Sequence, residues 1–198
     1  MSIEITNLKK SFSKKPLFFI EELTLQTGFT IIRGPSGCGK TTLGRIIAGI
    51  EPYDSGKVNG ASGNPTILFQ ESRLLPSVSA LDNINVVCRS KKYTVTAKEL
   101  LNQLGFNDED MKKRPSELSG GMMRRVAIVR AIVFALERGG NFVLLDEPFT
   151  GLDPETRSTA ASIIYEHLNN KHVLVITHDE DDTSLLNGRS IVFSDFAK

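Results

Sequence analysis

The sequence has 198 residues, of which 40% are hydrophobic and 24% charged, as is ordinary for a globular domain. Its 24 Lys and Arg residues nearly balance 23 Asp and Glu residues, so no broad nucleic-acid surface and no nucleic-acid partner are expected. The two cysteines, Cys38 and Cys88, lie far apart with no Cys/His cluster, which argues against a structural zinc or redox motif.

The N-terminus and the longest apolar stretch bear on location. The first residues do not combine a basic segment with an apolar run, so a secretory signal is not predicted. A membrane-spanning helix needs about 20 apolar residues, and the stretch from Val126 to Leu136 is shorter and contains Arg130. We therefore expect a cytoplasmic protein, and any transported substrate would cross the membrane through a partner.

The first seventy residues alternate strands with one helix. A glycine-rich segment separates an apolar run from a helical pattern, and Asp54-Ser55-Gly56 and Asn59-Gly60 indicate turns. Alternation and apolar runs predict the other elements. We expect strands at residues 3–5, 17–25, 29–32 and 66–69, and a helix at 40–50.

The middle of the chain is more polar. Residues 71–117 interrupt the alternation of strands and helices, and residues 97–104 predict a short amphipathic helix. We interpret 1–198 as a single domain, in which 71–117 form an inserted helical subdomain and 1–70 with 118–198 form the core.

The last third returns to long helices and buried strands. A helix is expected to begin after Ser119-Gly120-Gly121 and to stop at Gly139-Gly140, with its apolar residues spaced by three and four positions. Continuous apolar runs at 142–145 and 172–176 are typical of strands buried on both faces of a parallel sheet. Asp153-Pro154 predicts the start of another helix. The fold class is therefore α/β with a mainly parallel sheet.

One segment matches the phosphate-binding P-loop pattern G-x-x-x-x-G-K-[ST]. Its glycines allow the backbone to curl around a phosphate, and the following helix directs its positive end at the same anion. Lys40 is expected to reach the β- and γ-phosphates, and Thr41 to ligate Mg²⁺. The predicted nucleotide-binding residues of this segment are Gly34, Pro35, Ser36, Gly37, Cys38, Gly39, Lys40, Thr41 and Thr42.

Two adjacent carboxylates follow the apolar run at 142–145. Asp146 is expected at the carboxyl end of the sheet, beside the P-loop, where it can bind Mg²⁺. Glu147 is then free to polarise the attacking water as a general base. ATP and Mg²⁺ are thus the expected ligands.

The order of motifs resembles that of ABC ATPases. Leu118-Ser119-Gly120-Gly121-Met122 follows the P-loop and precedes Asp146-Glu147; it is similar to the family's L-S-G-G-Q signature, with Met122 replacing the usual Gln. This resemblance covers nearly the whole chain. It implies a P-loop NTPase core, an antiparallel β subdomain from the N-terminal strands, and the inserted helical subdomain.

The resemblance also implies roles for single residues. Gln70 would link Mg²⁺ and the attacking water to the helical subdomain, and His178 would contact the γ-phosphate. Ser119, Gly120 and Gly121 would contact ATP bound to a second cassette, Asp153 would cross the dimer interface, and Phe12 would stack on adenine. The catalytic residues are therefore predicted to be Glu147, His178 and Gln70, and the Mg²⁺ ligands Thr41, Gln70 and Asp146.

The implied partners are a second copy of this chain or a homologous cassette, packed head to tail, and transmembrane permease subunits. Residues 73–76 and 81–84 resemble the segment that contacts the permease in nitrate, sulfonate and taurine importers. The chain would then lie on the inner face of the cell membrane. Alternatives are a soluble ABC ATPase, for example in iron–sulfur cofactor assembly, and a P-loop nucleotide kinase; the kinase does not explain residues 118–121.

Overall fold

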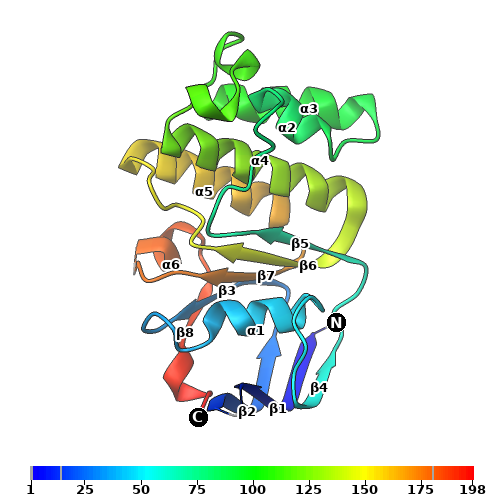
Figure 1. The fold of residues 1–198 in the computed structure, drawn as a ribbon, viewed down its shortest axis with the longest axis vertical. Helices are drawn as coiled ribbons and strands as arrows, with labels where there is room; N and C mark the ends of the chain where they lie inside the picture. Colours follow the sequence, from blue (N-terminus) through cyan, green and yellow to red (C-terminus); the bar gives the residue numbers. More distant parts are fainter. Residues whose placement is uncertain (1, 14, 180) are drawn as a thin grey trace.

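The computed structural model describes residues 2–13, 15–179 and 181–198 (Figure 1). Within them a five-stranded sheet has the order β5-β6-β7-β3-β8, and every neighbouring pair is parallel. Its strands are β3 (Gly28–Arg33), β5 (Asn64–Leu68), β6 (Gly139–Asp146), β7 (His172–Ile176) and β8 (Arg189–Val192). The expected α/β class with a parallel sheet is confirmed.

The two faces of this sheet enter two different cores. In β6, Phe142 and Leu144 join one cluster, whereas Val143 and Leu145 join the other. The side chains of a strand alternate between the faces of a sheet, and the continuous apolar run of β6 thus supplies both cores. This explains why the run reads as uniformly hydrophobic rather than as alternating apolar and polar residues.

One face of the sheet is covered by helices in two layers (Figure 1). The inner layer is α4 (Gly120–Arg138) and α5 (Pro154–Leu168), and the outer layer is α2 (Ala80–Asn85) and α3 (Lys91–Gln103), which pack on α4. Short 3₁₀ helices at Asp110–Lys112 and Pro115–Glu117 connect α3 to α4. Gly139 ends α4 in the left-handed conformation, with φ of 71°, as its glycine predicted.

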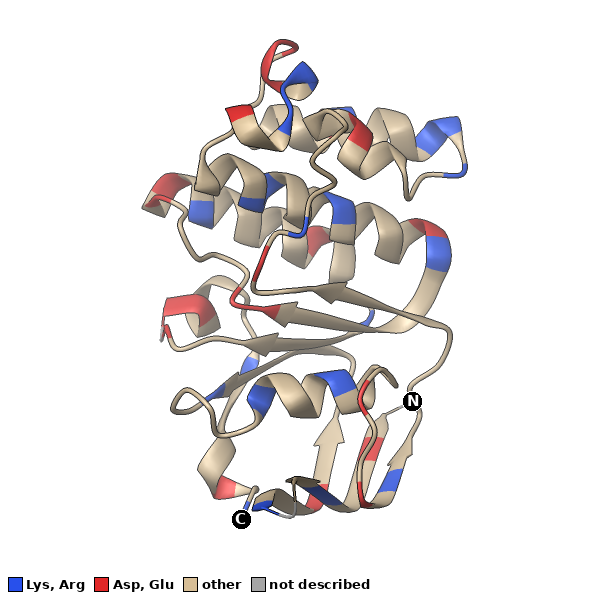
Figure 2. Ribbon diagram, in the orientation of Figure 1, with Lys and Arg blue, Asp and Glu red and all other residues tan. Residues whose placement is uncertain are grey.

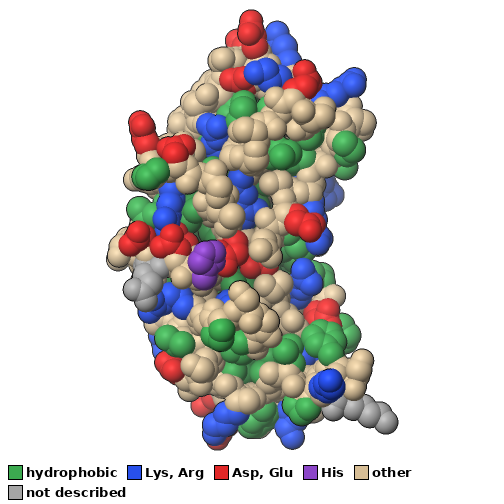
Figure 3. Space-filling model, turned by 60° about the vertical axis from the view of Figure 1, so that its left-hand side comes forward, with side chains coloured by type: hydrophobic (Ala, Val, Ile, Leu, Met, Phe, Trp, Pro, Cys, Tyr) green, Lys and Arg blue, Asp and Glu red, His purple; other side chains and the backbone are tan. Residues whose placement is uncertain are grey.

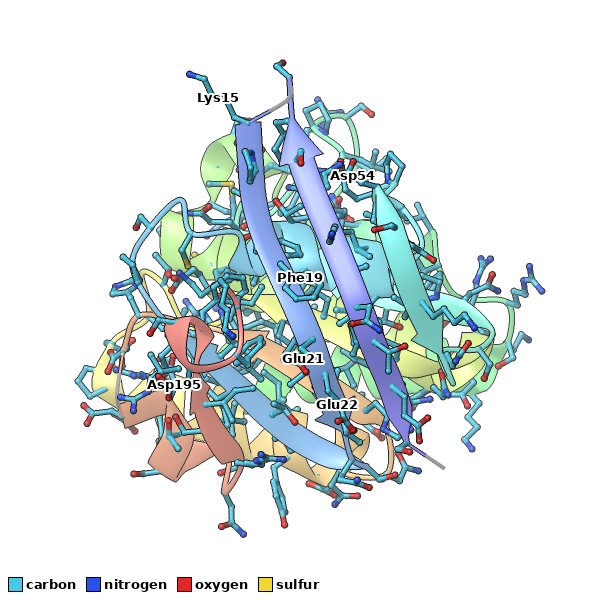
Figure 4. The ribbon with its side chains drawn as sticks, turned by 90° about the horizontal axis from the view of Figure 1, so that it is seen from below. Lys15, Phe19, Glu21, Glu22, Asp54 and Asp195 are labelled. Atoms are coloured by element: carbon cyan, nitrogen blue, oxygen red, sulfur yellow. The ribbon has the colours of Figure 1, made fainter. Side chains whose placement is uncertain are left out.

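The other face carries α1 (Lys40–Ile47) and a small antiparallel sheet of order β2-β1-β4. Its strands are β1 (Ile3–Phe12), β2 (Lys15–Leu25) and β4 (Ser55–Asn59). The outer surface of this sheet is seen in Figure 4, where Phe19 and Glu21 are labelled on β2. Main-chain hydrogen bonds join Phe19 to Lys198 and pair the free edge of β2 with the end of the chain. The β subdomain implied by the resemblance is thus present.

Several element boundaries differ from the sequence expectations. The segment read as turns between Asp54 and Gly60 contains β4, because its residues pair with β1 although only Val58 among them is a large apolar residue. The helix expected at 97–104 is the longer α3. Helix α1 stops at Ile47 rather than residue 50, and a short helix α6 (Asp181–Leu185) and strand β8 were not predicted. The boundaries proposed for the helical subdomain remain a prediction, since one apolar cluster runs from α3 to the sheet.

Candidate ATP-hydrolysis site

The P-loop connects β3 to the first turn of α1. Gly34, Gly37 and Gly39 all have positive φ, and Gly39 caps the helix at φ of 112°. A Cβ atom at Gly39 would lie 2.7 Å from the Phe18 ring, so both conformation and space require glycine there. The loop thereby presents the N-terminus of an eight-residue helix, which favours a bound anion.

Lys40 is folded back onto this loop. Its Nζ donates to the carbonyl oxygens of Gly34 at 2.7 Å and Pro35 at 2.8 Å, and the side chain is largely buried. The ammonium group therefore lies inside the curl of the P-loop, where it can exchange carbonyl oxygens for phosphate oxygens.

Thr41 and Asp146 meet at the end of β6. The Thr41 hydroxyl donates to Asp146 Oδ2 at 2.9 Å, across 105 positions of sequence. Asp146 is only 4% exposed, and burial raises the pKa of its carboxyl group, although the hydrogen bond from Thr41 opposes the rise. The sequence prediction that these two groups lie together is supported by this contact.

Glu147 occupies a turn immediately after β6. Its φ is 49°, an unfavourable value for a residue other than glycine. Its N–H donates to the carbonyl of Ile176 at 2.8 Å, at the end of β7. Its carboxylate Oε1 lies 2.9 Å from His178 Nδ1, and this contact, more than any other cause, raises the pKa of His178.

Glu147 and His178 line a partly open pocket of about 250 Å³. The His178 side chain is 75% exposed, whereas that of Glu147 is 16% exposed. Figure 3 shows a histidine with acidic side chains beside it on this face. In the ribbon view of Figure 2, acidic residues gather where β6 ends and around α6, while α1 carries basic residues. A phosphate bound at the basic α1 would thus lie opposite the carboxylates of Asp146 and Glu147.

Gln70 and Phe12 have looser surroundings. Gln70 lies two residues beyond β5, and its side chain is exposed. Its main-chain carbonyl accepts a hydrogen bond from Arg124, in which the side-chain amide takes no part. Phe12 is 48% exposed and lies 4.3 Å (ring centroid) from Lys10 Nζ. It lines a pocket of about 310 Å³ with P-loop residues, among them Gly39 and Thr42. Phe12 is thus near the P-loop, as an adenine-stacking residue would be.

The signature segment lies at the start of α4, apart from that pocket. The Ser119 side chain caps the helix by accepting from Met122 N at 3.2 Å. A Cβ at Gly121 would approach the Gly151 carbonyl to 2.9 Å, but one at Gly120 would meet nothing within 4 Å.

Asp153 caps α5 by accepting from Thr156 N at 2.9 Å, and this hydrogen bond lowers the pKa of its carboxyl group. Among the described residues, none from the signature lines the P-loop pocket.

Sequence reasoning missed several supporting residues. Asp182 is buried; it accepts hydrogen bonds from Arg157 on α5 and from the Thr177 hydroxyl, and Arg157 also pairs with Asp179 at 2.7 Å. These contacts fix the segment that carries His178. Arg124 was missed as well. Neither arginine belongs to a recognised motif, and only the fold brings them to their partners.

The fold and this arrangement define a P-loop nucleotide hydrolase. Comparison with known proteins narrows the class: the family model for ABC transporters matches residues 22–150. The aliphatic sulfonates import ATP-binding protein SsuB 1 of Nocardia farcinica is 37% identical over 97% of this chain and 78% of its own length. The corresponding SsuB protein of Corynebacterium glutamicum is 35% identical over 98% of this chain and 80% of its own length. The chain belongs to the ABC transporter family.

Solved structures agree on the fold. A dimeric bacterial ABC transporter cassette superposes with a TM-score of 0.80 at 24% identity, covering 96% of this chain and 93% of the other. An ABC transporter ATP-binding protein from Pyrococcus furiosus gives the same TM-score at 21% identity, with full coverage of both chains.

Family membership settles the main interpretation of the sequence. The chain is an ATPase cassette that binds ATP and couples its hydrolysis to transport, which is favoured over the soluble ABC ATPase and the kinase. No helix among the described residues is long and apolar enough to cross a membrane. The roles of single site residues remain proposals.

Proposed function

We propose that this chain hydrolyses ATP at a site that two cassettes complete together, and that it thereby drives import through a membrane-embedded partner. The observation that carries the proposal is the meeting of Thr41, Asp146, Glu147 and His178 around the mouth of the P-loop. ATP would lie with its phosphates against α1 and its adenine against Phe12. Lys40 would exchange the carbonyls of Gly34 and Pro35 for phosphate oxygens.

Within one chain, Glu147 is the proposed general base. Its carboxylate stands free of Thr41 and Asp146, can accept a proton from the attacking water, and is oriented by His178 at 2.9 Å. His178 would also face the γ-phosphate, and its raised pKa favours the cation that stabilises negative charge there. Gln70 is proposed to turn its exposed amide toward the same water when ATP is bound.

The donor set fits Mg²⁺. A threonine hydroxyl and a buried carboxylate already lie within hydrogen-bond distance of each other, and oxygen ligands of this kind are those that Mg²⁺ prefers. Thr41 and Asp146 would hold the ion, with Gln70 as a third ligand. When bound, Mg²⁺ would neutralise charge on the β- and γ-phosphates.

A second cassette is proposed to supply Ser119, Gly120 and Gly121. The start of α4 favours anions, the space beside Gly120 is open, and the signature lies outside the P-loop pocket of its own chain. A head-to-tail copy would bring this helix start to the neighbouring γ-phosphate, with Asp153 at the interface.

The variant Ser119→Arg tests this composite site. ATP binding to the isolated chain should persist, because Ser119 does not serve its own P-loop, whereas hydrolysis should be lost because a bulky cation obstructs the neighbour's nucleotide. Ser162→Arg, at an exposed serine in the middle of α5, is the matched control and should hydrolyse normally. Normal hydrolysis by Ser119→Arg, with a specific activity independent of protein concentration, would rule out the composite site.

The permease is proposed to dock on a groove between β5, the segment that follows α2, and α4. The groove encloses about 440 Å³ and is lined largely by apolar side chains, together with the two basic residues Arg73 and Arg130. Leu75 and Val86 on its border are 45% and 52% exposed. It includes part of the segment that resembles importer subunits, which would place the chain on the cytoplasmic face of the membrane.

Charge introduced into the groove separates docking from hydrolysis. Val86→Asp should abolish co-purification with the membrane protein encoded alongside, while the isolated chain still hydrolyses ATP. Val95→Asp on α3, at a valine that is 57% exposed outside the groove, should co-purify normally. Equal capture of both variants would place the permease elsewhere.

The names of the relatives suggest the substrate class. Several proteins 31–38% identical to this chain are aliphatic sulfonates import subunits, so we propose an aliphatic sulfonate as the transported solute. A host without its own sulfonate-import ATPase should grow on ethanesulfonate as sole sulfur source only when supplied with this chain and its permease. Failure to grow, with the complex assembled and hydrolysing ATP, would exclude this substrate.

A further inference from the structure

Arg124 is a buried cation beside the catalytic carboxylates. It lies on α4 and is 3% exposed. Its hydrogen-bond partners among the described residues are all main-chain carbonyls. Nε donates to Pro148 at 2.9 Å, Nη1 to Phe69 at 2.6 Å and Gln70 at 3.1 Å, and Nη2 to Asp146 and Glu147, both at 2.7 Å. A guanidinium group has five N–H donors, so each donor has one carbonyl.

These carbonyls belong to two turns that leave neighbouring strands. One turn follows β5 and carries Gln70, and the other follows β6 and carries Glu147. The strands are paired in parallel up to Leu68 and Leu145, and beyond that point no further pair of the ladder is formed. Beyond the last pair of the ladder, the rigid, planar guanidinium group of Arg124 joins the two chain segments by hydrogen bonds.

The conformation of Glu147 calls for such support. A non-glycine residue in the left-handed region is strained and persists only when its surroundings enforce it. The N–H of Glu147 is held by the Ile176 carbonyl, and its carbonyl is held by Arg124. The carbonyls on either side, those of Asp146 and Pro148, are held by the same guanidinium. Four main-chain groups of this turn are therefore fixed, three of the four by Arg124.

We propose that Arg124 is a positioning residue for ATP hydrolysis, which holds the Glu147 turn in its left-handed conformation and fixes the separation between Glu147 and Gln70. This rests on the proposed role of Glu147 as general base. Arg124 does not touch the nucleotide; it acts through the backbone that aims the carboxylate at the attacking water.

The charge of Arg124 persists in this buried place. Burial lowers its pKa to about 10, and the nearby Asp146 and Glu147 oppose the fall, so the group is protonated at neutral pH. A lysine would keep the charge but has only three donors on a point-like ammonium. A glutamine would lose the charge and offer two donors. Neither has enough donors to hold all five carbonyls.

The experiment compares Arg124→Lys and Arg124→Gln in the full chain. We expect kcat to fall about 100-fold, the usual effect of misplacing a catalytic group by about an ångström, with the smaller loss in Arg124→Lys. The KM and the equilibrium affinity for Mg·ATP should change much less than kcat, because Arg124 contacts no P-loop residue and holds only the main-chain carbonyls of the proposed Mg²⁺ ligands Asp146 and Gln70. Lys171→Met is the matched control: Lys171 Nζ donates to the Gly140 carbonyl at 2.8 Å, at the opposite end of β6. It should lower the melting temperature without changing kcat.

A second measurement separates positioning from general stabilisation. Adding Arg124→Gln to Glu147→Gln should change the residual turnover by less than about threefold, since the general base that Arg124 positions is already absent. A second full loss in the double variant, or a wild-type kcat in Arg124 variants that bind ATP, would overturn the proposal. If Arg124→Gln does not fold, Arg124→Lys serves in both comparisons. Wild-type turnover in Glu147→Gln alone would instead remove the base on which the proposed function depends.

Discussion

The P-loop and the Glu147 turn are proposed to serve the same phosphate but are built differently. The P-loop is one continuous segment, and Lys40 closes it through carbonyls only five and six positions away. The Glu147 turn is held by residues 23 to 31 positions away, on α4, β7 and the segment after β7. The proposed phosphate-binding segment is therefore shaped by local contacts, whereas the proposed catalytic turn depends on how distant elements pack. Substitutions should accordingly separate binding from turnover.

The largest expected effect falls on turnover alone. Glu147→Gln keeps the size of the side chain and removes its basicity, so kcat should fall about 10²–10⁴-fold, the usual contribution of a positioned general base. Mg·ATP affinity should be retained, because Asp146 and the P-loop are unchanged. Single-turnover phosphate release and equilibrium binding measure the two quantities. Turnover within a few-fold of wild type would show that Glu147 is not the base.

Substitution in the P-loop should instead reduce the affinity for ATP. Lys40→Ala removes a charged donor to the phosphates, and such hydrogen bonds contribute about 1.5–3 kcal/mol, so ATP affinity should fall by roughly 10- to 100-fold. Titration with a fluorescent ATP analogue measures this loss, and turnover should fall with it. Thr24→Ala, on β2 away from the loop, is a control that should bind normally. Wild-type affinity in Lys40→Ala would remove Lys40 from the site.

The smallest effect is electrostatic and concerns His178. Glu147 raises the pKa of His178 above its ordinary value of 6.5, with lesser contributions from Asp179 and Asp182. Protonated His178 thus forms an ion pair with the Glu147 carboxylate at pH values below its raised pKa. The stabilising effect of this pair is lost as the pH rises through that pKa. That effect on stability should be slight because His178 is exposed.

Nuclear magnetic resonance titration of the His178 ring can detect the pKa directly. The His178 pKa should fall toward 6.5 in Glu147→Gln and should fall by less in Asp179→Asn, since Glu147 is the largest cause of the rise. An unchanged His178 pKa in Glu147→Gln would contradict the contact between the two side chains.

The same contrast explains what the sequence could reveal. A contiguous pattern predicted the P-loop, the carboxylates after the apolar run and the helix start at Asp153; it placed the start of α4 after Gly121, whereas the helix begins at Gly120. The strand β4 escaped notice because its pairing with β1, not its own residues, makes it a strand. Arg124 and Asp182 escaped because a charged residue on a helix ordinarily predicts a solvated face. Their burial becomes visible only when α4 and α6 pack against the turns after β6 and β7.

Two cassettes are proposed to complete each ATP site, in which Glu147 performs the chemistry. The most direct test is the mass of Glu147→Gln in solution, measured by light scattering after size-exclusion chromatography at high protein concentration. With Mg·ATP the variant should bind nucleotide, close into a dimer and remain dimeric, because hydrolysis no longer opens it; with Mg·ADP it should be monomeric, and adding Ser119→Arg should abolish the dimer. A monomer in saturating Mg·ATP, or a dimer of equal population in ADP, would contradict the account.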